Sequence, residues 1–207
     1  MDSGSAARIE VRERRPDDDD SALALRNAVF PPIAPEDWVK SQAAAIARLD
    51  DRLVGVIPFI IRPFVLAPGV VIRAAFANSV AVAADLRDQG IGSRMMAAAR
   101  QFLPAHADAM CVYTGREAEG PQYRFYRRTG HHDLLYPHRM TKPTPAPAVL
   151  PGGAAVAATD EIESVEAALL DVFAQCFAGR GGFPQREPGY WRQALASHIF
   201  VEVPYDA

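Results

Sequence analysis

The spacing of apolar and polar residues predicts a mixture of helices and strands along residues 8–140. Alternating polarity and short apolar runs predict strands, whereas apolar residues three or four positions apart predict amphipathic helices. The clearest helix opens at Gly90, because Ile91, Met95 and Phe102 then share one helical face. The predicted strands are residues 8–12, 45–49, 53–61, 70–77, 78–83, 109–113 and 133–136, and the predicted helices are 21–29, 90–102 and 121–128, with a short helix through Trp38. This order indicates a mixed α/β (α+β) fold.

Proline, glycine and aspartate mark where these elements begin and end. Pro16 and the aspartates at 17–20 predict a helix start, since acidic side chains are favoured at a helix N-terminus. Residues 30–35 contain three prolines and are expected to form a loop, because proline fixes φ and has no N–H to donate. Gly130 is expected to end the last of these helices.

A change in composition divides the chain after residue 142. Residues 143–159 are rich in Pro, Ala and Gly, which is typical of a linker. The pattern beyond them predicts an amphipathic helix over residues 162–176, a loop beginning at Phe183-Pro184, a helix over 190–196 and a strand over 199–203. We therefore expect a first domain over residues 1–142, a linker and a helical C-terminal segment over 160–207.

A short pattern occurs twice and bears on that last segment. Pro35-x-x-Trp38 is matched by Pro188-x-x-Trp191, and an isoleucine follows each tryptophan by eight residues. One interpretation is that residues 160–207 open a second domain similar to the first but incomplete. The other is a helical extension that packs on the first domain.

Composition and charge restrict the classes of function. Of the 207 residues, 49% are hydrophobic and 23% charged, which is enough for a folded core. A net charge of −3 predicts no broad cationic surface, and hence no nucleic-acid partner. The most apolar stretch is interrupted by Arg and Pro, so no membrane segment is expected. The two cysteines have no metal spacing, and nor do the histidines at 131, 132 and 138, so we expect no metal and a reducing, cytoplasmic location.

The segment over residues 80–94 has the composition of an anion site. It is predicted to run from a buried strand through a tight turn into a helix, and Gly90 and Gly92 would let backbone N–H groups approach a phosphate. Arg87 adds a permanent positive charge. No Gly-Lys-Ser/Thr follows, so a nucleoside triphosphatase loop is excluded, and Met95 in the third-glycine position argues against a dinucleotide fold.

Two motifs resemble those of the GNAT superfamily of acyl-CoA-dependent N-acyltransferases. Arg87, Gly90 and Gly92 match its Arg/Gln-x-x-Gly-x-Gly/Ala cofactor motif, and Phe125-Tyr126 followed by Gly130 is similar to its Phe-Tyr-x-x-x-Gly helix end. The resemblance covers residues 7–140. It implies a mostly antiparallel central sheet with flanking helices, in which the strand containing Val80 to Val82 splays from its neighbour.

The resemblance also implies a role for each site residue. Acetyl-CoA would be the acyl donor, with its pantetheine arm along the strand backbone and its pyrophosphate at the loop. Tyr126 matches a tyrosine that protonates the departing thiolate in many members, unless it is an ordinary core aromatic. Glu36, Asp37 and Asn78 would lie on the acceptor side, although a solvated helix start is the preferred explanation of the two acids. The residues expected to contact acetyl-CoA are Val80, Ala81, Val82, Arg87, Asp88, Gln89, Gly90, Ile91, Gly92 and Ser93.

Three positions depart from the family pattern. Glu119 replaces an asparagine that often contacts the cofactor, and His131 stands where phenylalanine usually follows the helix glycine. Asn78 and Ser79 occupy the place where many relatives carry a glutamate that acts as general base. The sequence therefore assigns no general base.

These features predict an N-acetyltransferase that transfers an acetyl group from acetyl-CoA to a primary amine of a small molecule or peptide. Attack of the amine on the thioester would be direct, without a covalent enzyme intermediate. The alternative is a catalytically silent GNAT-like module that binds acyl-CoA or scaffolds a partner. The acceptor amine, the acyl-chain preference and whether the chain forms a homo-oligomer stay open.

Overall fold

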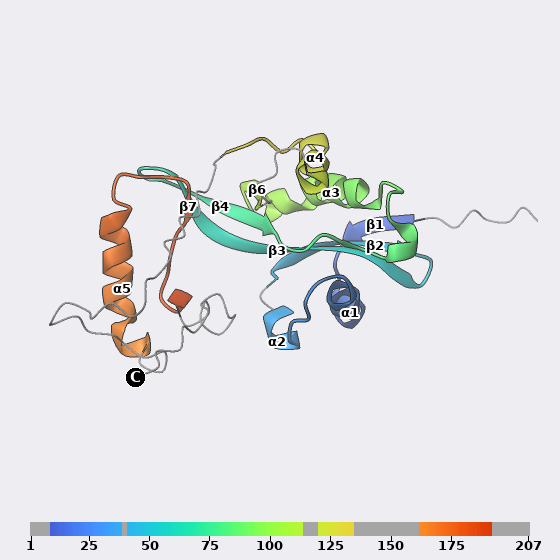
Figure 1. Ribbon diagram of the computed structural model, residues 1–207, viewed down its shortest axis with the longest axis horizontal. Coiled ribbons are helices and arrows are strands. Elements are labelled where there is room, and N and C mark those ends of the chain that lie inside the picture. The colour runs from blue at the N-terminus through green and yellow to red at the C-terminus, as the bar shows by residue number, and fades with distance from the viewer. Residues whose placement is uncertain (1–8, 39–40, 114–119, 135–161, 192–207) are drawn as a thin grey trace, which may run out of the picture. The chain divides into compact units, whose positions relative to one another are not determined.

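The computed structural model describes residues 9–38, 41–113, 120–134 and 162–191, shown in colour in Figure 1. These residues belong to two compact units. The first unit comprises residues 1–64 and 70–133, and the second comprises residues 65–69 and 134–207. The predicted linker over residues 143–159 and the strand over 199–203 lie outside the described residues, as does most of the helix over 190–196. The division into three parts along the sequence therefore stays a prediction.

A twisted sheet forms the centre of the first unit. Its strands are ordered β1 (Ile9–Glu13), β2 (Ala43–Leu49), β3 (Arg52–Ala67), β4 (Val70–Ala77) and β6 (Ala109–Val112), and β5 (Ala81–Val82) pairs with β3. The pairs β1/β2, β2/β3 and β3/β5 are antiparallel, whereas β4/β6 is parallel. The mixed and mostly antiparallel sheet predicted from the sequence is confirmed.

Helices cover both faces of this sheet (Figure 1). On one face lie α1 (Asp19–Val29) and α2 (Pro35–Trp38), and on the other lie α3 (Ile91–Phe102) and α4 (Pro121–Arg128). Short 3₁₀ turns η1 (Pro16–Asp18), η2 (Ala84–Leu86) and η3 (Leu103–Ala105) lead into or out of them. The helices lie where the sequence predicts them, with bounds shifted by one or two residues.

The core consists of two apolar layers, one on each face of the sheet. The layer under α3 contains Met95, Met96 and Phe59, all fully buried, and the layer under α1 contains Ala22, Trp38 and Ile46. Alternation along β2 explains the division, since successive strand residues point to opposite faces and all of Ala43 to Ala47 are buried. These two apolar layers fix α3 on one face of the sheet and α1 on the other.

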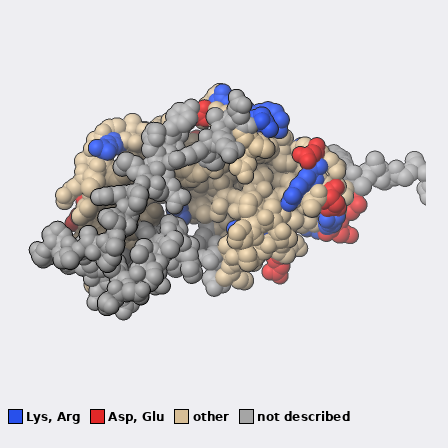
Figure 2. Space-filling model, in the orientation of Figure 1, with Lys and Arg blue, Asp and Glu red and all other residues tan. Residues whose placement is uncertain are grey.

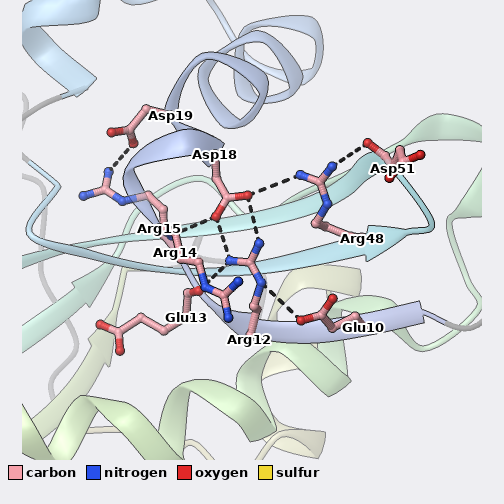
Figure 3. Close-up of polar contacts among 9 residues, drawn as sticks. All are labelled: Glu10, Arg12, Glu13, Arg14, Arg15, Asp18, Asp19, Arg48 and Asp51. Carbon is pink, nitrogen blue, oxygen red and sulfur yellow. Dashed lines mark hydrogen bonds and ion pairs between the residues drawn. The ribbon is translucent and has the colours of Figure 1, made fainter.

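The aspartate run has a role that the sequence does not reveal. Asp18 is a buried ion-pair centre rather than only a favourable charge at a helix start (Figure 3). Its carboxylate, 3% exposed, accepts hydrogen bonds from Arg12 at 2.7 and 3.1 Å, from Arg48 at 3.2 Å and from the Arg15 N–H at 2.8 Å. Burial acts to raise the pKa of Asp18, but these donors outweigh it and leave the pKa below its ordinary value. The cluster joins β1 and β2 to the start of α1.

The second unit contains α5 (Ile162–Cys176) and β7 (Phe183–Pro184). The predicted helix is confirmed. The loop predicted at Phe183-Pro184 is wrong, because these residues form a short strand that pairs with the end of β3, and that end, from Val65 on, belongs to this second unit. Proline is tolerated there since a two-residue edge strand loses little by lacking one N–H donor. The Arg186 guanidinium lies 3.9, 4.8 and 4.4 Å from the ring centroids of Phe173, Tyr190 and Trp191.

Charged side chains are mixed in sign over the surface that Figure 2 shows. Arg52 and Asp85, both exposed, form one such pair through two hydrogen bonds of 2.8 Å.

None of the helices in the described residues has the length and apolar character that a membrane span needs. Cys111 and Cys176 are free thiols.

Candidate functional site

The sheet opens between β4 and β6. Among the residues that the structure describes, the parallel pairing runs from Ala74–Ala109 to Ala77–Val112. Beyond Ala77 the chain stays beside β3, where Ala81 and Val82 pair with Val56 and Gly55. The backbone over residues 78–82 therefore continues along β3 after its pairing with β6 has ended. This is the place where the family resemblance implies a splayed strand.

A bulge marks the point where the strands part. The Asn78 N–H donates to the Pro58 carbonyl at 2.9 Å, and Ala81 lies opposite Val56, so three steps along this strand face two along β3. Ser79 takes up the extra residue with φ of 68°, a left-handed conformation unusual for a residue other than glycine. Pro58 has no N–H, so the reciprocal bond to the Asn78 carbonyl cannot form. The proline thus favours a break in the ladder here.

The loop between β5 and α3 forms the second part of the site. The Arg52–Asp85 ion pair fastens η2 at its base, and the Arg87 guanidinium donates to the Val82 carbonyl at 3.3 Å. Gly90, the N-cap of α3, has φ of 76° and nothing within 4 Å of the place where a Cβ would stand. Since glycine has no side chain with which to cap the helix, the first-turn N–H groups of α3 are left for solvent or a ligand. An anion is favoured at such a helix start.

Gly92 brings the loop, the splayed strand and α4 together. A Cβ built on Gly92 would stand 3.2 and 3.3 Å from Phe125 ring carbons and 3.9 Å from the Val80 Cγ1. Any larger residue would push Phe125 of α4 away from the first turn of α3. The two sequence motifs, which lie more than 30 residues apart in the chain, therefore meet in space at this glycine.

Tyr126 lies next to this contact. Its ring packs edge-on against Phe125, with centroids 5.1 Å apart, and against His131 at 5.5 Å. The side chain is partly buried against the core layer under α3. Burial raises the pKa of the Tyr126 phenol, so the group stays protonated at neutral pH. A protonated phenol in this position is able to act as a proton donor.

The sequence of this region matches a known family model. Residues 40–132 match the model of the acetyltransferase (GNAT) domain, a range that includes β2 to α4 and both motifs. This chain contains a GNAT domain. No curated protein matches it significantly, so the family model carries the assignment.

Solved structures agree with the fold of this GNAT domain. One is the aminoglycoside N-acetyltransferase AAC(6')-Iy in complex with CoA, with a TM-score of 0.55 and 16% sequence identity over 68% of this chain and 99% of the other. A second is AAC(6')-Iy in complex with the bisubstrate analogue CoA-S-monomethyl-acetylneamine, with a TM-score of 0.54 and 16% identity over 66% and 99% of the two chains. At this identity the likeness shows the GNAT fold.

Several other predicted positions of the GNAT domain are now placed. Asn78 is exposed at the bulge beside Pro58, and its role on the acceptor side stays a prediction. Glu36 and Asp37 belong to α2, but their side chains lie outside the described residues, as does Glu119. His131 packs against Tyr126, and its buried Nε2 has no hydrogen-bond partner among the described residues. Burial lowers the pKa of His131, so its imidazole is mainly neutral at pH 7.

Two features of the site escape sequence reasoning. Pro58 lies inside a predicted strand, and a proline there is itself a signal of an irregular ladder. Phe76 and Tyr113 stack at the end of β4 and β6, with centroids 5.5 Å apart and planes 10° apart, and no local pattern pairs these two rings.

Among the described residues, no three His, Cys, Asp or Glu side chains come together as a metal site.

Proposed function

We propose that this chain is an acetyl-CoA-dependent N-acetyltransferase that acylates a primary amine of a small molecule or peptide. One observation carries the proposal: the strand over residues 78–82, a helix start that no side chain caps and a protonated phenol lie together in the first unit. The names of the aminoglycoside N-acetyltransferases that share the fold support an amine acceptor. The free thiols of Cys111 and Cys176 support a reducing, cytoplasmic location.

The loop and the splayed strand would hold the donor. The first-turn N–H groups of Ile91, Gly92 and Ser93 would receive the pyrophosphate, with the charge of Arg87 nearby. The backbone over residues 80–82 would pair with the pantetheine arm, in the manner of an added strand, on the side that faces away from β3. The Val82 carbonyl on that side accepts from Arg87 and would exchange this donor for the arm. Asp88, with φ of 61°, and Gln89 complete the turn that presents these groups.

Acetyl transfer would proceed by direct attack of the neutral amine on the thioester carbonyl. A C–N bond forms, the C–S bond breaks, the thiolate takes the proton of the Tyr126 phenol, and the amine gives up its extra proton to solvent. Backbone N–H groups near the bulge at Ser79 would stabilise the carbonyl oxygen as it gains charge. Asn78 would lie on the acceptor side of this reaction, as would α2 with Glu36 and Asp37.

The test is amine-dependent release of the CoA thiol. Purified protein with acetyl-CoA is given a panel of primary amines, and thiol release is followed with a chromogenic disulfide; tertiary amines with the same skeletons serve as matched controls. We expect release with primary amines only. Saturable binding of acetyl-CoA with no release on any primary amine would support a silent acyl-CoA-binding module instead.

A further inference from the structure

Three aromatic side chains form a continuous surface on the sheet of the first unit. Phe64 of β3 contacts Phe76 of β4 with ring centroids 5.9 Å apart, and Phe76 stacks on Tyr113, which directly follows β6. We call Phe64, Phe76 and Tyr113 the aromatic face. It runs from core to solvent, since Phe64 is 2% exposed, Phe76 is partly buried and Tyr113 is 64% exposed.

Strand register places the aromatic face on the side of the sheet opposite α3 and α4. Ala75 packs in the core layer under α3, so its neighbour Phe76 points to the other side. Phe76 lies opposite Cys111 in the β4/β6 register, and Tyr113, two residues on, shares the side of Cys111. The loop at Gly90 and the phenol of Tyr126 belong to the α3/α4 side, so the aromatic face lies across the sheet from them.

The aromatic face also borders the point where the sheet opens. Ala77 and Val112 form the last parallel pair in the part of the chain that the structure describes, and Asn78 and Tyr113 are the first residues beyond it. A thioester that reaches through the opening from the α3/α4 side presents its carbonyl to an amine that comes from the other side. The exposed ring of Tyr113 therefore lies on the path by which the amine would approach the thioester carbonyl carbon.

The composition of these strand ends indicates what kind of amine fits. Residues 74–78 and 109–113 contain no charged side chain, so the two strand ends offer no carboxylate to a polycation. The strand ends offer the ring of Tyr113, whose plane is 10° from that of Phe76 in the stacked pair. A flat ring on the substrate is the group that would extend this stack. Saturated polyamines and aminosugars would gain less from a stack on this ring, whatever charge α2 adds elsewhere on the acceptor side.

We propose that the aromatic face is the acceptor-binding surface and that it selects a primary amine carried on a planar aromatic ring, which stacks on Tyr113. This inference rests on the proposed acetyltransferase function. Phe76 holds the Tyr113 ring from beneath, and Phe64 anchors Phe76 in the core. Tyr113 is thus the specificity-determining residue, while Tyr126 and the loop act on the donor.

The experiment compares two amines that differ only in the ring. 2-Phenylethylamine and 2-cyclohexylethylamine have the same chain and amine, but only the first ring is flat. We expect the full chain to acetylate the aromatic amine with a kcat/KM several-fold higher. Tyr113→Leu should raise KM for the aromatic amine about 3- to 10-fold with little change in kcat, which is the range that loss of one ring stack gives. Tyr113→Phe, which keeps the ring, should stay within about twofold of the parent.

Controls separate this proposal from the function on which it rests. Val71→Ala changes an exposed apolar side chain at the far end of β4 and should leave both KM values unchanged. The affinity for acetyl-CoA and the melting temperature of each variant show whether the donor site and the fold are intact. If primary amines are acetylated but the two rings are used equally, or Tyr113→Leu leaves KM unchanged, the aromatic face is not the acceptor surface. If no primary amine is acetylated, the proposed function itself fails.

Discussion

Gly90→Asp tests the loop as the binding place of the acetyl-CoA pyrophosphate. Nothing lies within 4 Å of a Cβ built on Gly90, so the new side chain meets no steric clash within the protein. The backbone has φ of 76°, which costs a residue other than glycine about 1–2 kcal/mol in stability. The substitution should therefore leave a folded protein with a slightly lower melting temperature.

The effect on binding follows from the charge. A carboxylate on Gly90 would stand about 4 Å from a pyrophosphate bound at the first turn of α3, where two unit charges repel by about 1 kcal/mol in bulk water and about 4 kcal/mol near a protein surface. Since about 1.4 kcal/mol is tenfold in affinity, the Kd for acetyl-CoA should rise about tenfold or more. High salt should reduce this loss, because it screens the repulsion.

Gly69→Asp is a matched control for the same change. Gly69 has φ of 74° and nothing within 4 Å of its Cβ position, so the two substitutions add the same charge and the same backbone strain in equally open surroundings. Gly69, however, lies in the turn between β3 and β4, away from the loop. Calorimetry with acetyl-CoA and thermal melting are measured for both variants. We expect equal losses of stability and weakened binding for Gly90→Asp alone. Unchanged affinity in a folded Gly90→Asp protein, or equal weakening in both variants, would refute the assignment of the loop.

Three further predictions concern the chemistry, the stability and the domain division. Tyr126→Phe should keep the affinity for acetyl-CoA but lower turnover roughly 100-fold, because the phenol proton is lost; unchanged steady-state turnover would assign the phenol to packing. Asp18→Asn should lower the unfolding free energy by about 2–4 kcal/mol at pH 7. The pKa of Asp18 is lowered in the folded state, so its contribution to the free energy of unfolding is full above the ordinary aspartate pKa and is lost as the pH falls through the pKa of the folded state. In denaturant titrations, the unfolding free energies of parent and variant should therefore converge at low pH. A chain that ends at Pro147 should be soluble, bind acetyl-CoA and melt cooperatively, since the first unit then has its own sheet; an insoluble product would mean that residues 162–203 supply part of its core.

The sequence by itself determined the elements that depend on short-range signals. The helix after Gly90 follows from apolar spacing and from a glycine that adopts a positive φ, and the turn at Gly69 and the helix end at Gly130 have the same origin, with φ of 74° and 80°. Each signal acts over a few residues and needs no distant partner. The two glycine-containing motifs also carried the family resemblance for the same reason, because close backbone approach restricts which residues fit.

Only the tertiary structure decided how distant segments meet. The sequence predicts strands over 78–83 and 109–113, but it does not give their register, and the irregular ladder at Asn78 depends on Pro58 in a third strand. The Asp18 cluster likewise depends on Arg48, 30 residues away, and the stack of Tyr113 on Phe76 depends on parallel pairing of β4 with β6. Long-range pairing is set by the sum of many weak contacts across the sheet, so no local pattern encodes it.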